Sequence, residues 1–306
     1  LVPFMDVYPG DLTHHNIFSI RRGYGGQPDG ANIGWTPGFW PGMIWLAYEL
    51  SGEARFRQAG EHHVQSFLRR IEQHVDVEIH DLGFMYSPTC VAAWILTGSP
   101  AARRAALLAA EHLMTRFWPA PGIFQAWGGL DDPNERGRTI IDSLMNMPLL
   151  YWASRETGDL RYQQAAFRHT CQLRDHFIRP DHTTFHTYYF DVVTGAGVRG
   201  RTAQGARDDS CWARGQAWGI YGFTLNYRHT GDASLLQTAC QLADYFLAHL
   251  PVDKVAYWDL IFGEGSGEER DSSAAAIAVC GLMEMADLLP PGSEQGSAYR
   301  AAALEI

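Results

Sequence analysis

The sequence has no long hydrophobic run, no run of basic residues and no closely spaced pair of cysteines. Nowhere do 18 apolar residues follow one another, and no basic segment leads into an apolar one at the start, so neither a membrane span nor a secretory signal is expected. The formal net charge of -10 comes from 34 acidic and 24 basic residues among 306. This balance does not suit a phosphate backbone, so we expect no nucleic-acid partner.

Five cysteines are spread singly through apolar or helical surroundings, without any CxxC pair: Cys90, Cys171, Cys211, Cys240 and Cys280. This usage is typical of buried thiols in a reducing compartment and argues against disulfides or a cysteine zinc site. The sequence therefore predicts a cytoplasmic protein.

Several motifs of well-known chemistry are also missing. There is no HExxH, and the pairs His14-His15 and His62-His63 are adjacent instead of four residues apart, so no metal site is expected. Neither a GxSxG elbow nor a phosphate-binding loop occurs, which disfavours a serine nucleophile or a nucleotide cofactor. We expect no cofactor.

One local pattern recurs four times: LSGEARFRQAG from Leu50, LTGSPAARRAA from Leu96, ETGDLRYQQAA from Glu156 and HTGDASLLQTA from His229. In each copy a glycine can end one helix in the left-handed conformation, and Ser99, Asp159 or Asp232 can then cap the next helix. Each copy therefore predicts the elbow of a helical hairpin.

The segments before the elbows are apolar nearly all round, as in ARGQAWGIYGFTLNY, whereas those after them have one charged face, as in RYQQAAFRHTCQLRDHF. The first kind is typical of inner helices and the second of outer helices. This alternation predicts an all-α array of hairpins, which a closed ring would bury. The short elbows occupy one end, so the long aromatic loops should emerge together at the other.

Two acids, Asp81 in IHDLGFMY and Asp142 in RTIIDSLMN, stand at loop-to-helix junctions. Either one could cap its helix, and Thr139 with Asp142 fits a capping box. Alternatively, the two carboxylates could form a general acid/base pair across a pocket, with burial near Trp127 and the charge of Asp81 raising the pKa of Asp142. His80 and His186 are candidate hydrogen-bond donors to a substrate.

Six motifs occur in this order over roughly residues 30 to 285: WTPGFWPG, HDLGFMYS, IFQAWG, IIDSLMNMPLLYWA, FHTYYFD and DDSCWARGQAWGIYG. Together, and in the same order, they resemble the motifs of the unsaturated glucuronyl hydrolases, glycoside hydrolase family 88. The resemblance implies an (α/α)6 barrel forming a single domain over residues 1–306. It also implies hydrolysis of unsaturated uronic-acid oligosaccharides left by polysaccharide lyases, by hydration of the C4=C5 vinyl ether.

The resemblance implies roles for nine residues. Asp142 matches the general acid/base and Asp81 the second essential carboxylate, while the matched pocket residues are Trp35, His80, Trp127, His186, Gln204, Arg214 and Trp218. Arg214 and Trp218 are one helical turn apart, which favours a cation beside an aromatic plate on one helix face.

The sequence departs from the family pattern in three places. Ala203 stands where the family usually has histidine, the residues before Asn32 do not suit a first barrel helix, and the chain stops near the eleventh helix. We therefore expect a barrel that is incomplete at its C-terminus, present as a monomer or homodimer.

Three other functions remain open: an unsaturated rhamnogalacturonyl hydrolase acting on pectin fragments, an (α/α)6 epimerase, and a non-catalytic sugar-binding barrel. The paired acids fit the epimerase poorly.

Overall fold

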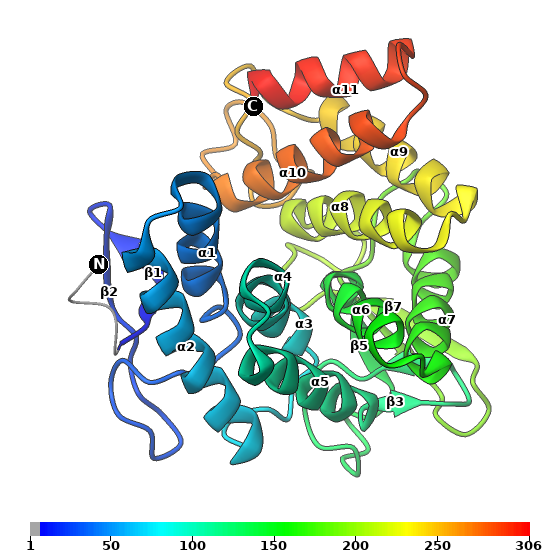
Figure 1. Cartoon of the computed structure of the whole chain (residues 1–306). Coiled ribbons are helices and arrows are strands. Elements are labelled where there is room, and N and C mark those ends of the chain that lie inside the picture. Colours follow the sequence, from blue (N-terminus) through cyan, green and yellow to red (C-terminus); the bar gives the residue numbers. More distant parts are fainter. Residues whose placement is uncertain (1–6) are drawn as a thin grey trace. The chain divides into compact units, whose positions relative to one another are not determined.

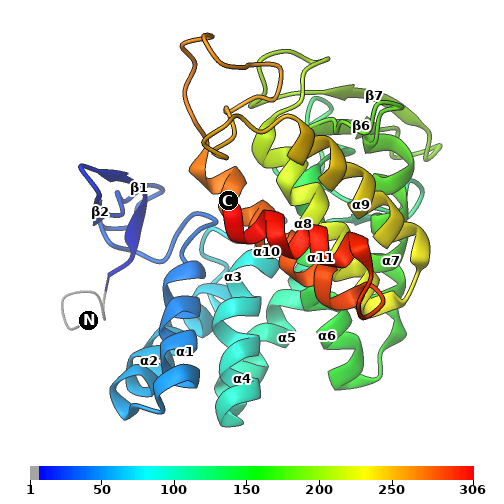
Figure 2. The same ribbon diagram turned by 90° about the horizontal axis from the view of Figure 1, so that it is seen from above.

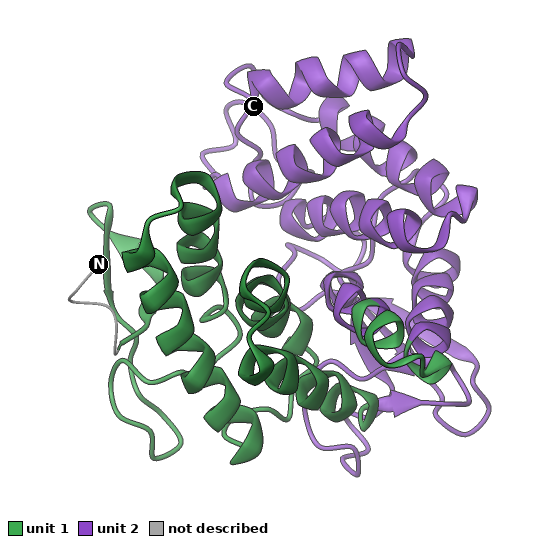
Figure 3. Ribbon diagram, in the orientation of Figure 1, with its two compact units in different colours: residues 1–116, 152–162 green, residues 117–151, 163–306 purple. Residues whose placement is uncertain are grey.

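The computed structural model describes residues 7–306, which form two compact units (Figure 3). Unit 1 contains the residues up to 116 together with 152–162, and unit 2 contains 117–151 and 163–306. The helices are α1 (Phe39–Ser51), α2 (Ala54–Glu72), α3 (Leu82–Tyr86), the π-helical η2 (Ser87–Val91), α4 (Ala92–Thr97), α5 (Pro100–Met114), the 3-10 helix η3 (Ile141–Asn146), α6 (Met147–Thr157), α7 (Leu160–Phe177), α8 (Ala213–Thr230), α9 (Ala233–Ala248), α10 (Ser272–Leu288) and α11 (Glu294–Glu305). The strands are β1 (Pro9–His14), β2 (Ile17–Ile20), β3 (Phe117–Trp118), β4 (Ile123–Phe124), β5 (Arg138–Ile140), β6 (Thr187–Phe190) and β7 (Gly197–Arg201).

Unit 1 is built from two helical hairpins and the β1–β2 hairpin. Helix α1 packs on α2, α4 packs on α5, and α2 packs on α5. Trp45 of α1 is buried against Gly60 of α2, where a Cβ atom would come within 2.5 Å of the indole ring. The close approach of these two helices therefore depends on a glycine at position 60.

The four elbows have the predicted geometry. Gly52, Gly98, Gly158 and Gly231 all adopt left-handed backbone conformations, with φ between 68° and 78°. The predicted caps also form: the side chains of Ser99, Asp159 and Asp232 accept hydrogen bonds from the backbone N–H groups of Ala102, Arg161 and Ser234. The prediction of helical hairpins is thus confirmed at each elbow.

Unit 2 is organised around α8, which packs against η3 and against its neighbours α9 and α10, which are labelled in Figure 1. Eleven of its 18 residues are buried, as the apolar sequence of this helix predicts. Gly222 allows the contact with η3, because a Cβ atom there would lie 2.5 Å from Leu144 Cβ. This contact anchors the segment that carries Asp142.

The loop-rich end of unit 2 contains a three-stranded antiparallel sheet, β5-β6-β7, which the sequence did not predict. Thr139 pairs with Tyr188, and Tyr188 pairs with Gly200. The loop before α8 and the loop before α10 lie at the same end of the unit (Figure 2), and Ala206 of the first donates its N–H to Asp259 of the second. In unit 2, the prediction that the long loops share one end is therefore confirmed.

None of the helices within residues 7–306 has both the length and the apolar character needed to cross a membrane.

Candidate active site

Asp81 occupies the position before the first turn of α3 in unit 1, but it does not serve as a cap. In the described structure its side chain makes no capping hydrogen bond. Instead, Asp81 Oδ1 lies 3.2 Å from Nε2 of the buried His80. The interpretation of Asp81 as a simple helix cap is therefore wrong.

Arg116 is a charged neighbour of Asp81 that no sequence motif marks. Its side chain is only 1% exposed, and burial lowers the pKa of the guanidinium, while the negative charges of Glu78 and Asp81 act in the opposite direction. A buried cation beside Asp81 favours the ionised form of that carboxylate.

Trp35 is 39% exposed and presents a partly open indole in unit 1. Its ring packs edge-on against Phe84 of α3, with the ring centroids 5.6 Å apart. An indole supported on one side and open on the other suits the apolar face of a sugar ring.

Asp142 is the second residue of η3 in unit 2 and is partly buried. The predicted capping box is wrong, because Thr139 lies in strand β5 and its hydroxyl donates to Ser143 Oγ at 3.3 Å. The residue at the cap position is Ile140, and in the described structure no side chain caps η3. Asp142 thus lies two residues after the end of strand β5 and does not cap η3.

His186 is fixed next to this segment. Its backbone carbonyl accepts a hydrogen bond from Ile141 N at 3.0 Å, and its Nδ1 accepts one from Ala203 N at 2.8 Å. Burial, with smaller contributions from the charges of Arg214 and Arg138, lowers the pKa of His186 to about 4. At neutral pH the ring is therefore uncharged, and its proton is on Nε2 because Nδ1 acts as an acceptor. This buried Nε2 has no hydrogen-bond partner within residues 7–306.

Arg214 and Gln204, two of the predicted binding residues, contact each other. Arg214 Nη2 donates to Gln204 Oε1 at 3.1 Å, and Nη1 lies 3.2 Å from Asp271 Oδ2. The guanidinium stacks over Trp212, 4.7 Å from the ring centroid. The aromatic plate beside the cation is therefore Trp212, a residue that the sequence analysis did not select, while Trp218 is buried one turn further along α8.

Trp127 also has a cationic partner. The guanidinium of Arg138 lies 4.0 Å from the Trp127 ring centroid, and Arg138 also pairs with Glu135. Strand β5 thus carries this arginine only four residues before Asp142.

Asp259 is fully buried and organises the loop that carries Gln204. Its two carboxylate oxygens accept hydrogen bonds from Ala206 N at 2.9 Å, Ser210 Oγ at 2.6 Å, Cys211 N at 3.2 Å and Ile261 N at 3.2 Å. These contacts define the start of α8 and therefore the position of Arg214. No sequence motif marks Asp259, because its partners lie up to 53 residues away.

Within residues 7–306, one group of side chains has donor atoms close enough together to hold a metal ion: His74, Glu78 and His112. These residues belong to unit 1, and none of them was selected from the sequence. The histidine pairs that stand out in the sequence, His14-His15 and His62-His63, are not part of this group.

The fold is shared with solved unsaturated glucuronyl hydrolases. The crystal structure of the enzyme from Bacillus sp. GL1, responsible for the degradation of glycosaminoglycan, matches with a TM-score of 0.92 and 42% identity over 100% of this chain and 78% of that chain. An aspartate-to-asparagine mutant of the Streptococcus agalactiae enzyme, complexed with dGlcA-GalNAc6S, matches with a TM-score of 0.82 and 39% identity over 98% and 72% of the two chains. The predicted α/α barrel is thus confirmed, and the chain is a glycoside hydrolase of the unsaturated glucuronyl hydrolase type.

Related sequences identify the family of the chain. The unsaturated chondroitin disaccharide hydrolase of Streptococcus pyogenes serotype M1 is 46% identical over 299 residues, which are 98% of this chain and 72% of that protein. The profile of Glycosyl Hydrolase Family 88 matches residues 20–286, and the chain belongs to this family.

Proposed function

We propose that the enzyme removes the 4,5-unsaturated glucuronic acid from the non-reducing end of oligosaccharides produced by polysaccharide lyases, with Asp142 as general acid/base and Asp81 as the second essential carboxylate. The observation that carries this proposal is that both acids stand where a helix begins, yet neither caps its helix. Because neither carboxylate is used to cap a helix, both are available to act on a substrate.

In the proposed reaction, Asp142 donates a proton to C4 of the unsaturated ring, and positive charge develops at C5 and the ring oxygen. Water adds to C5 and returns its proton to the Asp142 carboxylate. The resulting hemiketal opens and releases the remaining sugar. A positioned acid/base group contributes on the order of 10² to 10⁴ in rate.

Asp81 has a buried cationic neighbour. The buried guanidinium of Arg116 interacts with Asp81, which favours a carboxylate there. We assign Asp81 the role of stabilising the positive charge that develops at C5. No metal takes part in these steps, so a chelator should leave the reaction unaffected.

The substrate's own carboxylate and hydroxyls would be bound by the polar groups selected above. Arg214 and Gln204 supply a charged and an amide contact, and the neutral His186 supplies an Nε2–H donor. His80, Trp35, Trp127 and Trp218 complete the proposed binding residues, and the indoles of Trp35 and Trp127, which are not fully buried, would face the apolar faces of sugar rings.

The relatives' names favour a glycosaminoglycan product over the pectin fragments of a rhamnogalacturonyl hydrolase, so an unsaturated chondroitin disaccharide is the first substrate to test. The cytoplasm is the proposed compartment, because all five cysteines are free thiols.

The test is the loss of ultraviolet absorbance as the double bond of an unsaturated chondroitin disaccharide is consumed. Asp142→Asn should bind the disaccharide but turn it over at least 10²-fold more slowly. Asp209→Asn is the matched control, because Asp209 is exposed and pairs with the nearby, exposed Arg207. Near-normal turnover by Asp142→Asn would refute the assignment.

A second substrate separates this reaction from conventional glycosidase chemistry. A saturated β-glucuronide has no C4=C5 bond to protonate, so it should not be cleaved. Appreciable cleavage would instead favour displacement at the anomeric carbon.

A further inference from the structure

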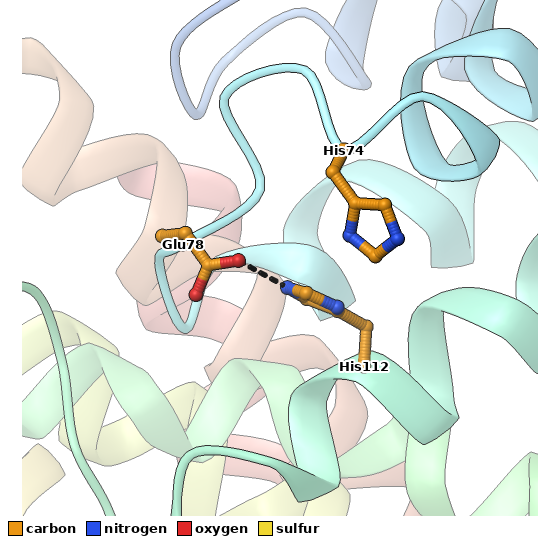
Figure 4. Close-up of side chains that lie close together, drawn as sticks. All are labelled: His74, Glu78 and His112. Atoms are coloured by element: carbon orange, nitrogen blue, oxygen red, sulfur yellow. Dashed lines mark ion pairs between the residues drawn. The ribbon is translucent and has the colours of Figure 1, made fainter. Parts of the chain in front are cut away.

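The connection between α2 and α3 brings two potential metal ligands to a third on a neighbouring helix. His74 and Glu78 lie in this connection, and His112 lies in the last turn of α5 (Figure 4). The ligand atoms of these three side chains all lie within 4.8 Å of one another. We propose that His74, Glu78 and His112 form a zinc-binding site.

The donor set and its spacing suit zinc. Two imidazoles and one carboxylate are a known zinc ligand set, which leaves a fourth position for water. With bonds of about 2.0–2.1 Å, the ligand atoms of a tetrahedral site are roughly 3.3 Å apart. Glu78 Oε1 and His112 Nε2 are already 3.1 Å apart. To reach this spacing, only the ligand atom of His74 must move toward those of Glu78 and His112, by about 1.5 Å at most. The His74 side chain is exposed.

The backbone at His74 gives a second, independent indication. His74 directly follows Gln73, the C-cap residue of α2, and has a left-handed conformation, with φ of 53°. Glycine or asparagine is favoured there, because a β-carbon is unfavourable in this conformation. The ion pair between Glu78 and His112 explains the positions of those two residues. It does not explain why an imidazole, instead of glycine, stands next to them with its ring centroid 5.3 Å from that of His112.

The charges around Glu78 leave one carboxylate oxygen for the metal. Glu78 Oε2 lies 3.9 Å from Arg116 Nη1, whereas Oε1 faces His112. A hollow lined by His74, His112, Glu111 and the ion pair of Glu72 with Arg104 gives the site access to solvent. The metal would therefore be bound by a single oxygen of Glu78 and by water from this side.

The site also has a structural consequence. The segment that contains His74 and Glu78 continues directly into His80 and Asp81. A zinc ion held by all three ligands would tie this segment to α5. It would act as a structural clip, separate from the proposed hydrolysis.

Isothermal titration of zinc chloride into the metal-free protein, without an affinity tag, tests the site. We expect one ion per chain. Loss of an outer-shell partner typically weakens metal binding 10- to 100-fold, so His112→Gln and Glu78→Gln should each lose at least that much. His249→Gln is the control, because this exposed histidine lies in unit 2 at the end of α9.

His74→Gly separates loss of the ligand from loss of the fold. Glycine suits the left-handed position, so this variant should melt at the same temperature as the wild type or higher without zinc, yet bind zinc at least tenfold more weakly. Cobalt binding gives a further readout, because a tetrahedral site produces visible absorption bands that the three ligand variants should lack. Wild-type protein that binds no zinc, or ligand variants that bind it as tightly as the control, would overturn the proposal.

Discussion

Replacing Asp259 by asparagine should destabilise the enzyme strongly, although the change is one of only a few atoms. Asp259 is fully buried and its two oxygens accept four hydrogen bonds. An asparagine keeps one acceptor oxygen and turns an NH2 group toward two of the former donors. Two hydrogen bonds to a charged acceptor are then lost, each worth about 1.5–3 kcal/mol, so we expect a loss of about 3–6 kcal/mol in the free energy of unfolding.

Urea denaturation of Asp259→Asn beside the wild type measures this loss. Asp209→Asn changes the same chemical group at an exposed position of the loop before α8, which Asp259 contacts, and should have no measurable effect on stability. A folded Asp259→Asn protein should also show a raised KM, because the start of α8 and the Gln204 loop lose their common anchor. A destabilisation below about 1 kcal/mol would refute this reasoning about the buried carboxylate.

Two further predictions concern pH. Burial lowers the pKa of His186 to about 4 and that of His169 to about 3, so between pH 6.5 and 4 the unfolded chain binds protons that the folded protein does not. The free energy of unfolding should therefore be highest above pH 6.5 and fall with decreasing pH, by about 3 kcal/mol for His186 alone. Urea denaturation at several pH values measures this slope; His186→Gln should flatten it, and an equally steep slope in that variant would contradict the explanation. Arg116→Gln removes the buried cation next to Asp81, so the acidic limb of the kcat/KM profile should move to higher pH, and an unshifted limb would show that this cation does not act on the chemistry.

The helical part of the fold was predictable because its signals are local. Each elbow combines a glycine with a capping side chain within a few residues, and Gly98 with Ser99 adopts the predicted geometry. The sheet was not predictable in the same way. Strands β5, β6 and β7 are short and lie in loops, and their pairing joins residues as far apart as Thr139 and Tyr188.

The same distinction applies to the candidate site. Motifs marked Asp81, Asp142 and Arg214, whereas the buried charges around them, Arg116 and Asp259, are distant in sequence from their partners. The capping box at Thr139 failed for a physical reason: strand pairing in β5 took precedence over the local side-chain pattern.

The hydrogen bond from Ala203 N to His186 Nδ1 has a consequence for substitutions at position 203. Because the bond uses the main chain, any residue except proline at position 203 can keep the His186 ring in the same tautomer and orientation. The side chain at this position is exposed and can therefore change without disturbing the histidine. A substitution at position 203 can thus change the exposed surface here while the His186 ring keeps its tautomer and orientation.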